Sequence, residues 1–79
     1  MTAGHDRERP EPSAGFLAAY GITPREADVL GCVLAGKPNK AIADELCVSV
    51  KTVETHLGSI YRKTGAEGRL ALFSLITRG

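Results

Sequence analysis

The sequence lacks the residue patterns that build disulfide scaffolds and metal sites. It contains two cysteines in 79 residues, Cys32 and Cys47, and they form no paired Cys/His motif of the kind that binds zinc. We interpret both as small packing residues or as reduced surface thiols. We therefore expect no metal and no cofactor in a chain that is one domain at most.

Other absences exclude further classes of protein. No apolar run is long enough for a membrane span, and none follows the charged N-terminus as in a secretion signal. We expect a cytoplasmic protein with no membrane partner. The sequence also shows no nucleophile paired with a base and no glycine-rich phosphate loop, so we expect no catalytic residues and no enzyme. We interpret its helical acids as solvated surface groups: Glu26, Asp28, Asp44 and Glu45.

The net charge of +1 is small for a protein that binds nucleic acid. The distribution of charge is more informative than the sum. Residues 1–30 carry three basic and five acidic side chains, whereas residues 37–63 carry five basic and three acidic ones. The positive charge is concentrated in the second half of the chain.

The patterning predicts short helices and no strands. We expect residues 1–15 to be a disordered tail or linker and residues 16–79 to form one domain. The stretch 16–20 is predicted to form a turn of helix at the core edge. Thr23, Pro24 and Glu26 then predict a capped helix start, and apolar residues at helical spacing continue until Gly36 and Pro38.

Three further helices follow at tight spacing. Asn39 is the predicted cap of a helix that ends near Leu46 or Cys47, and Ser49 is the predicted cap of the next. Gly65 is predicted to end that helix in a left-handed conformation. The last helix is expected from residue 68 or 69 to residue 77. The fold class is all-α, and the helices on either side of residue 47 are spaced as in a helix-turn-helix motif.

The helix after Ser49 has two different faces. Val53, Leu57, Ile60 and Thr64 are expected to point to the core. The opposite face carries hydroxyls, cations and a glycine: Lys51, Thr55, Gly58, Ser59 and Arg62. Such groups suit hydrogen bonds to phosphate and a close approach to a duplex, but a merely solvated face would have the same composition.

Four blocks of sequence resemble the LuxR/GerE family of bacterial DNA-binding domains over about residues 21–78. They are the runs 23–26 (Thr-Pro-Arg-Glu), 39–43, 48–57 and 61–65. The resemblance implies a four-helix helix-turn-helix DNA-binding domain, unrelated to winged helices. It would have a three-helix core, a third helix that reads DNA and a C-terminal dimerisation helix.

The resemblance also implies the roles of individual residues. Those at base-facing positions are Glu54, Thr55 and Gly58. Those at phosphate-contacting positions are Asn39, Lys40, Ser49, Lys51, Thr52, Arg62 and Lys63. One departure is Cys47, which occupies the turn where many helix-turn-helix proteins have glycine. A left-handed backbone at Cys47 would be mildly strained.

The last helix is apolar on all sides, which implies a second covered surface. We expect a homodimer through Leu72, Leu75 and Ile76, with Leu70 and Phe73 turned inward, or the reverse arrangement. A two-fold dimer would place two reading helices one turn of DNA apart, on a pseudo-palindromic site.

The expected function is therefore sequence-specific regulation of transcription. The third helix would lie in the major groove of double-stranded DNA. RNA polymerase is a further candidate partner, and no small-molecule ligand is expected in this chain. By resemblance, the chain is either a single-domain regulator or the output domain behind a receiver or ligand-binding domain. Two alternatives remain: a promoter reader like the fourth region of a sigma factor, and a protein-interaction module that uses the last helix without DNA.

Overall fold

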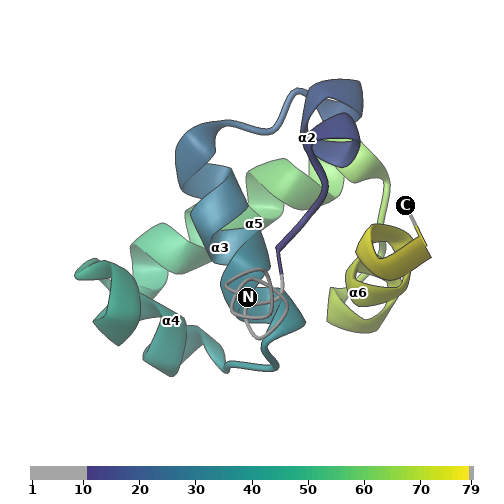
Figure 1. Cartoon of the computed structure of the whole chain (residues 1–79). Coiled ribbons are helices and arrows are strands. Elements are labelled where there is room, and N and C mark those ends of the chain that lie inside the picture. The colour runs from purple at the N-terminus through teal and green to yellow at the C-terminus, as the bar shows by residue number, and fades with distance from the viewer. Residues whose placement is uncertain (1–10, 79) are drawn as a thin grey trace, which may run out of the picture.

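The computed structural model describes residues 11–78, which form five α-helices and no strand (Figure 1). The all-α class and the helix-turn-helix arrangement expected from the sequence are confirmed. The helices, with the labels of Figure 1, are α2 (Ala14–Tyr20), α3 (Pro24–Leu34), α4 (Asn39–Leu46), α5 (Val50–Thr64) and α6 (Arg69–Arg78).

The helix starts at α3 and α5 follow from local side-chain caps. The Thr23 hydroxyl accepts a hydrogen bond from the Glu26 N–H at 3.1 Å, and the Glu26 carboxylate accepts one from the Thr23 N–H at 3.0 Å. Ser49 caps α5 by accepting from the Thr52 N–H. At the other end of α5, Gly65 adopts φ 77°, and its N–H bonds the Tyr61 carbonyl. These boundaries agree with the predicted ones.

The first described helix begins earlier than predicted. Ser13 caps α2 by accepting from the Phe16 N–H, so residues 14 and 15 are helical although they fall within the predicted tail. Residues 1–10 of that tail lie outside the described residues. The Phe16 side chain is buried in the core, and its ring centre lies 4.8 Å from that of Tyr20. This helix therefore belongs to the packed domain.

The prediction that Asn39 caps α4 is wrong. Pro38 occupies the cap position, without a side-chain cap, and Asn39 is the first helical residue. The Asn39 carboxamide is hydrogen-bonded instead to Arg69 of α6. At the other end of α4, Arg25 Nη2 donates to the Leu46 carbonyl at 3.0 Å. This eight-residue helix is thus held at both ends by arginines from other helices.

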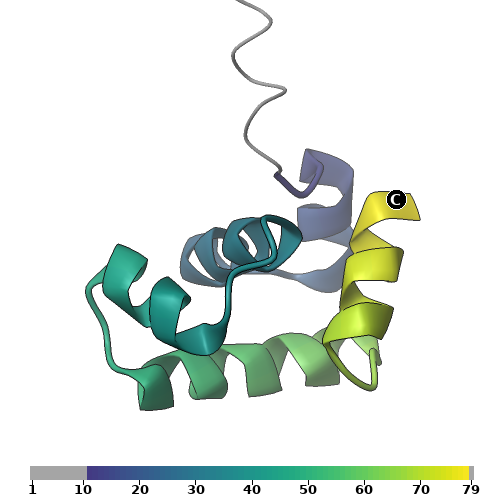
Figure 2. The same ribbon diagram turned by 90° about the horizontal axis from the view of Figure 1, so that it is seen from below.

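Helix α5 runs along one edge of the molecule (Figure 2). It packs against both α3 and α4, while α6 packs against α3 at the opposite end from α4. The buried apolar residues come from all five helices and form one core: Phe16, Val29, Leu30, Cys32, Val33, Ile42, Ala43, Val53, Leu57, Ile60, Leu72 and Ile76. The predicted core face of α5 is confirmed for Val53, Leu57 and Ile60, and Thr64 is half-buried.

The expected dimer face of α6 requires correction. Leu72 is 0% exposed and Ile76 is 5% exposed, because these residues lie one turn apart on the side that packs into the chain's own core. Leu75 is half-buried. The exposed apolar residues of α6 are Leu70, at 82%, and Phe73, at 40%. The reverse arrangement, left open by the sequence, is the one that the fold adopts.

The turn between α4 and α5 has a left-handed backbone. Cys47 adopts φ 59° and ψ 45° and is the only non-glycine residue of the described chain with a positive φ. An L-residue there loses about 1 kcal/mol relative to a relaxed backbone because its Cβ crowds the following carbonyl. The Cys47 side chain is exposed, so core packing does not offset this strain.

We expect Cys47→Gly to raise the free energy of unfolding by about 0.5–1 kcal/mol, since relief of strain exceeds the added entropy of the unfolded chain. Urea denaturation of the two proteins measures the difference. Cys47→Ser is the matched control, because it changes the thiol but keeps a Cβ, and it should unfold like the parent. A less stable glycine variant would contradict the prediction.

Candidate nucleic-acid interface

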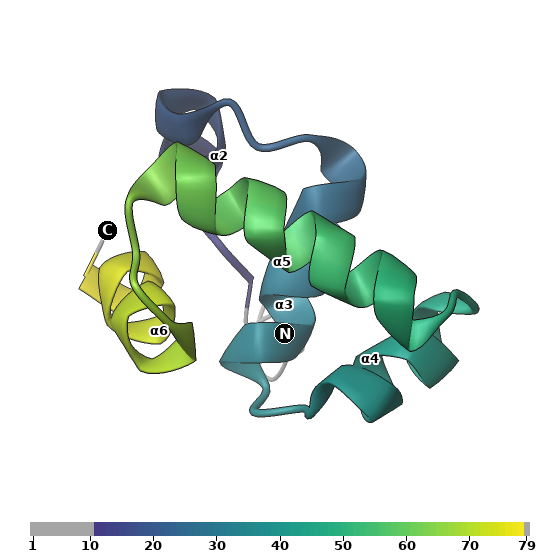
Figure 3. The same ribbon diagram turned by 180° about the vertical axis from the view of Figure 1, so that it is seen from behind.

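The outer face of α5 is open to solvent along the length of the helix. Figure 3 shows α5 in front of α3, with no described element in front of it. Lys51, Glu54, Thr55 and Arg62 are exposed on this helix, and Gly58 is half-buried. The face carries no exposed large apolar side chain after Val50. It therefore presents polar groups over about three helical turns.

The two expected base-facing side chains offer hydrogen-bond acceptors. The Thr55 hydroxyl donates to the Lys51 carbonyl at 3.1 Å, which uses its proton and leaves oxygen lone pairs available. The exposed Glu54 carboxylate is also an acceptor. Acceptors at this position match the amino groups that cytosine and adenine display in the major groove.

Gly58 leaves a gap in this face. A Cβ placed there would meet only Arg62 Nη1, at 3.8 Å, which is ordinary van der Waals contact. The free fold therefore does not require glycine at this position, and a helix-interior glycine costs about 1 kcal/mol relative to alanine. Gly58 lowers the surface between Thr55 and Arg62, so a ligand can approach the helix backbone closely.

Two hydroxyls and two helix starts form the rest of the expected phosphate site. Ser49 Oγ lies 3.0 Å from Thr52 Oγ1 at the N-terminus of α5. Asn39 and Lys40 begin α4, and the Lys40 side chain is exposed. Both helix N-termini present unpaired backbone N–H groups and the positive end of a helix dipole, which attract anions.

Lys63, expected at a phosphate-contacting position, also has partners within the chain. Its ammonium donates to the Glu26 carboxylate at 2.7 Å and to the Gly21 carbonyl at 2.9 Å. These contacts tie the end of α5 to the start of α3 and use two of the three N–H groups of the ammonium. Glu26, expected to be a solvated acid, is 4% exposed, which corrects that interpretation.

The surroundings of Glu26 stabilise its charge. Burial alone raises the pKa of Glu26, but hydrogen bonds from Lys63, the Thr23 N–H and Ser59, together with the Lys63 charge, outweigh it. They lower the pKa from 4.5 to about 2. Ser59, expected on the outer face, is half-buried and contributes to this inner cluster.

Sequence reasoning missed the two arginines that hold α4, Arg25 and Arg69. Each lies in the first turn of its helix, where the helix dipole disfavours a positive charge. That unfavourable placement was an available signal that both side chains have partners elsewhere. The partners themselves lie 21 residues from Arg25, and 30 and 32 residues from Arg69.

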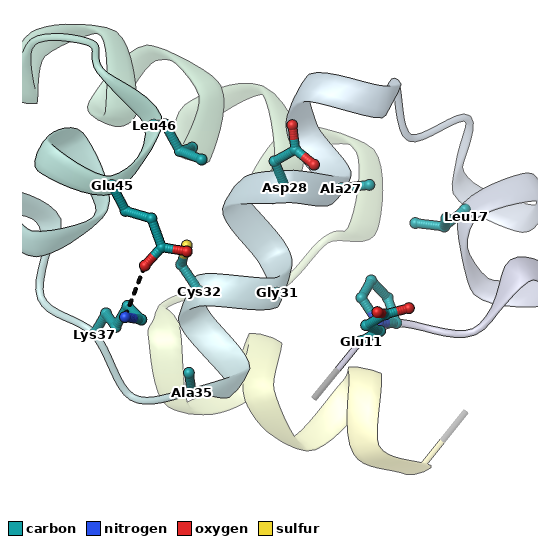
Figure 4. A pocket seen from close by; sticks show the side chains of 11 residues that line it. Glu11, Leu17, Ala27, Asp28, Gly31, Cys32, Ala35, Lys37, Glu45 and Leu46 are labelled. Carbon is teal, nitrogen blue, oxygen red and sulfur yellow. Dashed lines mark ion pairs between the residues drawn. The ribbon is translucent and has the colours of Figure 1, made fainter. Parts of the chain in front are cut away.

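An open groove of about 660 Å³ lies on the other side of α3 (Figure 4). Its wall includes the ion pair between Lys37 and Glu45, at 2.7 Å, and Cys32 lies beneath it. Burial, reinforced by Glu45, raises the pKa of the Cys32 thiol, which makes it a poor nucleophile at neutral pH.

Two negative findings concern residues 11–78. No three His, Cys, Asp or Glu side chains in this range come together as metal ligands. No helix in the described part is long and apolar enough to cross a membrane.

Comparisons with known proteins agree with this geometry. Residues 21–76 match the family described as bacterial regulatory proteins, luxR family. The chain is 43% identical over 65 residues to an HTH-type transcriptional regulator of Mycobacterium tuberculosis, covering 82% of this chain and 7% of that protein. It is 46% identical over 44 residues to the transcriptional regulatory protein MctR of Rhizobium johnstonii, covering 56% of this chain and 21% of that protein.

A third relative is “Probable transcriptional regulatory protein NarL” of Mycobacterium tuberculosis. It is 41% identical over 69 residues, covering 87% of this chain and 30% of that protein. The chain thus spans less than a third of each of these three relatives. Helix α2 lies outside the residues matched to the family, although it packs into the same core.

The Glu26–Lys63 pair predicts a defined acid sensitivity. Because the folded pKa of Glu26 lies below its unfolded value, the pair stabilises the fold above pH 4.5, and this stabilisation is lost as pH falls towards about 2. The shift corresponds to about 3 kcal/mol at neutral pH. We expect Glu26→Gln to lower the free energy of unfolding by about 2–3 kcal/mol at pH 7 and to flatten its dependence on pH between about 5 and 2.

Urea denaturation at a series of pH values tests this prediction. Asp28→Asn is the control, because Asp28 lies on the same helix in an exposed ion pair with Arg25 and should change stability by less than about 1 kcal/mol. Parallel pH profiles for parent and Glu26→Gln would show that Glu26 is not the stabilising acid.

Proposed function

Since the chain belongs to the luxR family of bacterial regulatory proteins, we propose that it binds specific sites in double-stranded DNA with α5 in the major groove. The matched relatives are named as transcriptional regulators, and the chain is a regulatory DNA-binding domain, not an enzyme. The observation that carries the proposal for α5 is its uncovered polar face, positioned by a helix-turn-helix with α4.

Specificity is assigned to the first half of α5. The Glu54 carboxylate and the Thr55 oxygen accept hydrogen bonds from base amino groups, and the Thr55 methyl can contact thymine. Because Gly58 has no side chain, the edge of the DNA groove can approach the helix backbone between Thr55 and Arg62. Discrimination by one such contact is about 1–3 kcal/mol.

Affinity is assigned to groups around this face that meet phosphates. The cations are Lys40, Lys51 and Arg62, all exposed. The neutral donors are the Asn39 amide and one hydroxyl of the Ser49–Thr52 pair, whose other proton is used between the two oxygens. Lys63 remains in the proposed contact set through its third N–H group, since Glu26 and Gly21 accept from only two and the side chain is partly exposed.

We further propose that two copies associate through the exposed side of α6. Leu70 is 82% exposed and Phe73 is 40% exposed, three residues apart on the side of α6 away from the core. A two-fold pair presents two α5 helices to one face of a duplex, which favours a pseudo-palindromic site with half-sites one helical turn apart.

The chain accounts for a small part of its matched relatives. We propose that it acts as the output domain of a regulator, in the cytoplasm where bacterial DNA lies, with RNA polymerase as a further partner. The exposed Leu70 favours a second candidate, a protein-interaction module that docks through α6 without DNA. Such a module would bind no duplex at any salt concentration.

The first test is titration of the chain onto DNA duplexes at several salt concentrations. We expect salt-dependent binding that is tighter for a selected palindromic duplex than for random sequence. Lys51→Ala should weaken binding to both duplexes and reduce the slope of log K against log salt by about 0.9, the release of one counterion.

Lys37→Ala is the matched control because its ammonium pairs with Glu45 in the groove on the other side of α3. The control should keep the parent slope. If the folded parent binds no duplex at low salt, the DNA-binding proposal fails and the interaction module is favoured.

The dimer has a separate test. Leu70→Glu should leave the monomer folded, since the side chain is 82% exposed, but should abolish the gain in affinity of a palindrome over a half-site. Sedimentation on the palindromic duplex measures the number of copies bound. Ala18→Glu adds the same charge at an exposed position of another helix, α2, and serves as the control. One copy of the parent on a full palindrome would contradict the dimer.

A further inference from the structure

We propose that Arg69 is a positioning residue for DNA binding, which fixes the Asn39 side chain so that its NH2 group faces a phosphate. This inference rests on the proposed function, since it concerns how the start of α4 meets the DNA backbone. It assigns a role in recognition to a residue that lies outside the helix-turn-helix motif, on the first turn of α6.

The contacts join three segments that are distant in sequence. Arg69 Nη1 donates to Asn39 Oδ1 at 3.2 Å, and Arg69 Nη2 donates to the Lys37 carbonyl. Both Arg69 and Asn39 are half-buried. The two nitrogens of one guanidinium thus hold the connection between α3 and α4, and the first residue of α4, against α6. Figure 1 shows this connection close to the first turn of α6.

The chemistry of the pair dictates the orientation of the amide. A guanidinium has only donors, so Asn39 must turn its oxygen towards Arg69. Its NH2 group then lies on the other branch of the planar carboxamide. Within residues 11–78 this NH2 group has no hydrogen-bond partner. Phosphate oxygens accept and do not donate, so the orientation that Arg69 enforces is the one that can bind phosphate.

The fixed orientation of the Asn39 amide matters at the start of α4 because this helix has no side-chain cap. Pro38 provides no side-chain cap, so the first N–H groups of α4 remain available to an anion. An unrestrained asparagine would sample both amide orientations and could fold back on these N–H groups as a cap. By binding Asn39 Oδ1, Arg69 prevents Asn39 from acting as a cap. The amide NH2 and the first N–H groups of α4 then remain available to the same phosphate.

The consequence is a link between α6 and the DNA contact of α4. Arg69 is the first residue of the helix that carries the exposed Leu70 and Phe73. A displacement of the α6 start would release Asn39 as well as the Lys37 carbonyl. The proposed dimer helix and a phosphate-binding residue thus share one side chain.

The test measures DNA affinity and its salt dependence for Arg69→Lys, Arg69→Gln, Asn39→Ala and the double variant Asn39→Ala/Arg69→Lys. Lysine keeps the charge but cannot bridge both acceptors in the fork geometry of arginine. We expect each single variant to raise the Kd for the selected duplex by roughly tenfold, the loss of one hydrogen bond to a charged group, with no change in salt slope. The double variant should bind no more weakly than Asn39→Ala.

A direct phosphate contact by Arg69 makes opposite predictions. Arg69→Lys would bind like the parent, Arg69→Gln would lower the salt slope by about 0.9, and the double variant would be weaker than Asn39→Ala. Any of these results overturns the proposal. Arg78→Lys, a change of the same type at the other end of α6, is the control and should bind like the parent.

Thermal unfolding followed by circular dichroism accompanies these titrations. If the Arg69 variants are not folded, Asn39→Asp decides the question. Aspartate keeps an acceptor for Arg69 and therefore the fold, but it turns a carboxylate oxygen towards the phosphate. We expect a loss of affinity at least as large as that of Asn39→Ala, and parent-like affinity overturns the proposal. Absence of DNA binding by the parent overturns the proposed function instead.

Discussion

The arrangement of α5, the proposed reading helix, depends on one buried carboxylate. Glu26 accepts from the Thr23 N–H, which starts α3, and from the Lys63 ammonium near the end of α5. Lys63 in turn donates to the Gly21 carbonyl, which ends α2. Three helices therefore meet at one ion pair. This charged contact adds a directional constraint to the apolar packing of α5 against α3 and fixes the end of α5 at a defined point.

The same logic applies to α4, with arginine as the fixing group. This helix has only two turns and no side-chain cap, so it depends on partners outside itself. Arg25 binds its last carbonyl and Arg69 binds its first side chain. Because α4 and α5 are joined by a strained three-residue turn, residues 47–49, a shift of α4 would also shift the start of α5. The two arginines thus support the geometry of the whole motif.

What could be predicted from the sequence was mainly local. The capping box at Thr23, the cap at Ser49 and the stop at Gly65 depend on residues within one turn of each other, and all three were confirmed. The spacing of Val53, Leu57 and Ile60 determined the buried face of α5 for the same reason. Cys47 stands, by resemblance, where many helix-turn-helix proteins have glycine, and its backbone is indeed left-handed.

The errors have a common physical origin, which is that the deciding contacts lie far apart in sequence. Helix α6 is apolar on all sides, so its sequence pattern does not indicate which side is buried. Only the packing of α6 against α3 shows that Leu72 and Ile76 point inward. Asn39 was predicted as a cap because the local pattern allowed it, but a guanidinium 30 residues away competes for its oxygen.

The small net charge has a structural explanation. It counts against DNA binding only when the positions of the individual charges are ignored. Three acids are paired with cations of the same chain, Glu26 with Lys63, Asp28 with Arg25 and Glu45 with Lys37. None of these pairs lies on α5's outer face, where Lys51 and Arg62 are exposed beside one acid, Glu54.

A charge more than about 8–10 Å away is screened at physiological salt, so a duplex on that face responds to the local charges and not to the net charge of the chain. A chain with a net charge of +1 can thus present a cationic edge to DNA. Lys63, which also counts in that sum, holds the end of α5 to α3 through Glu26.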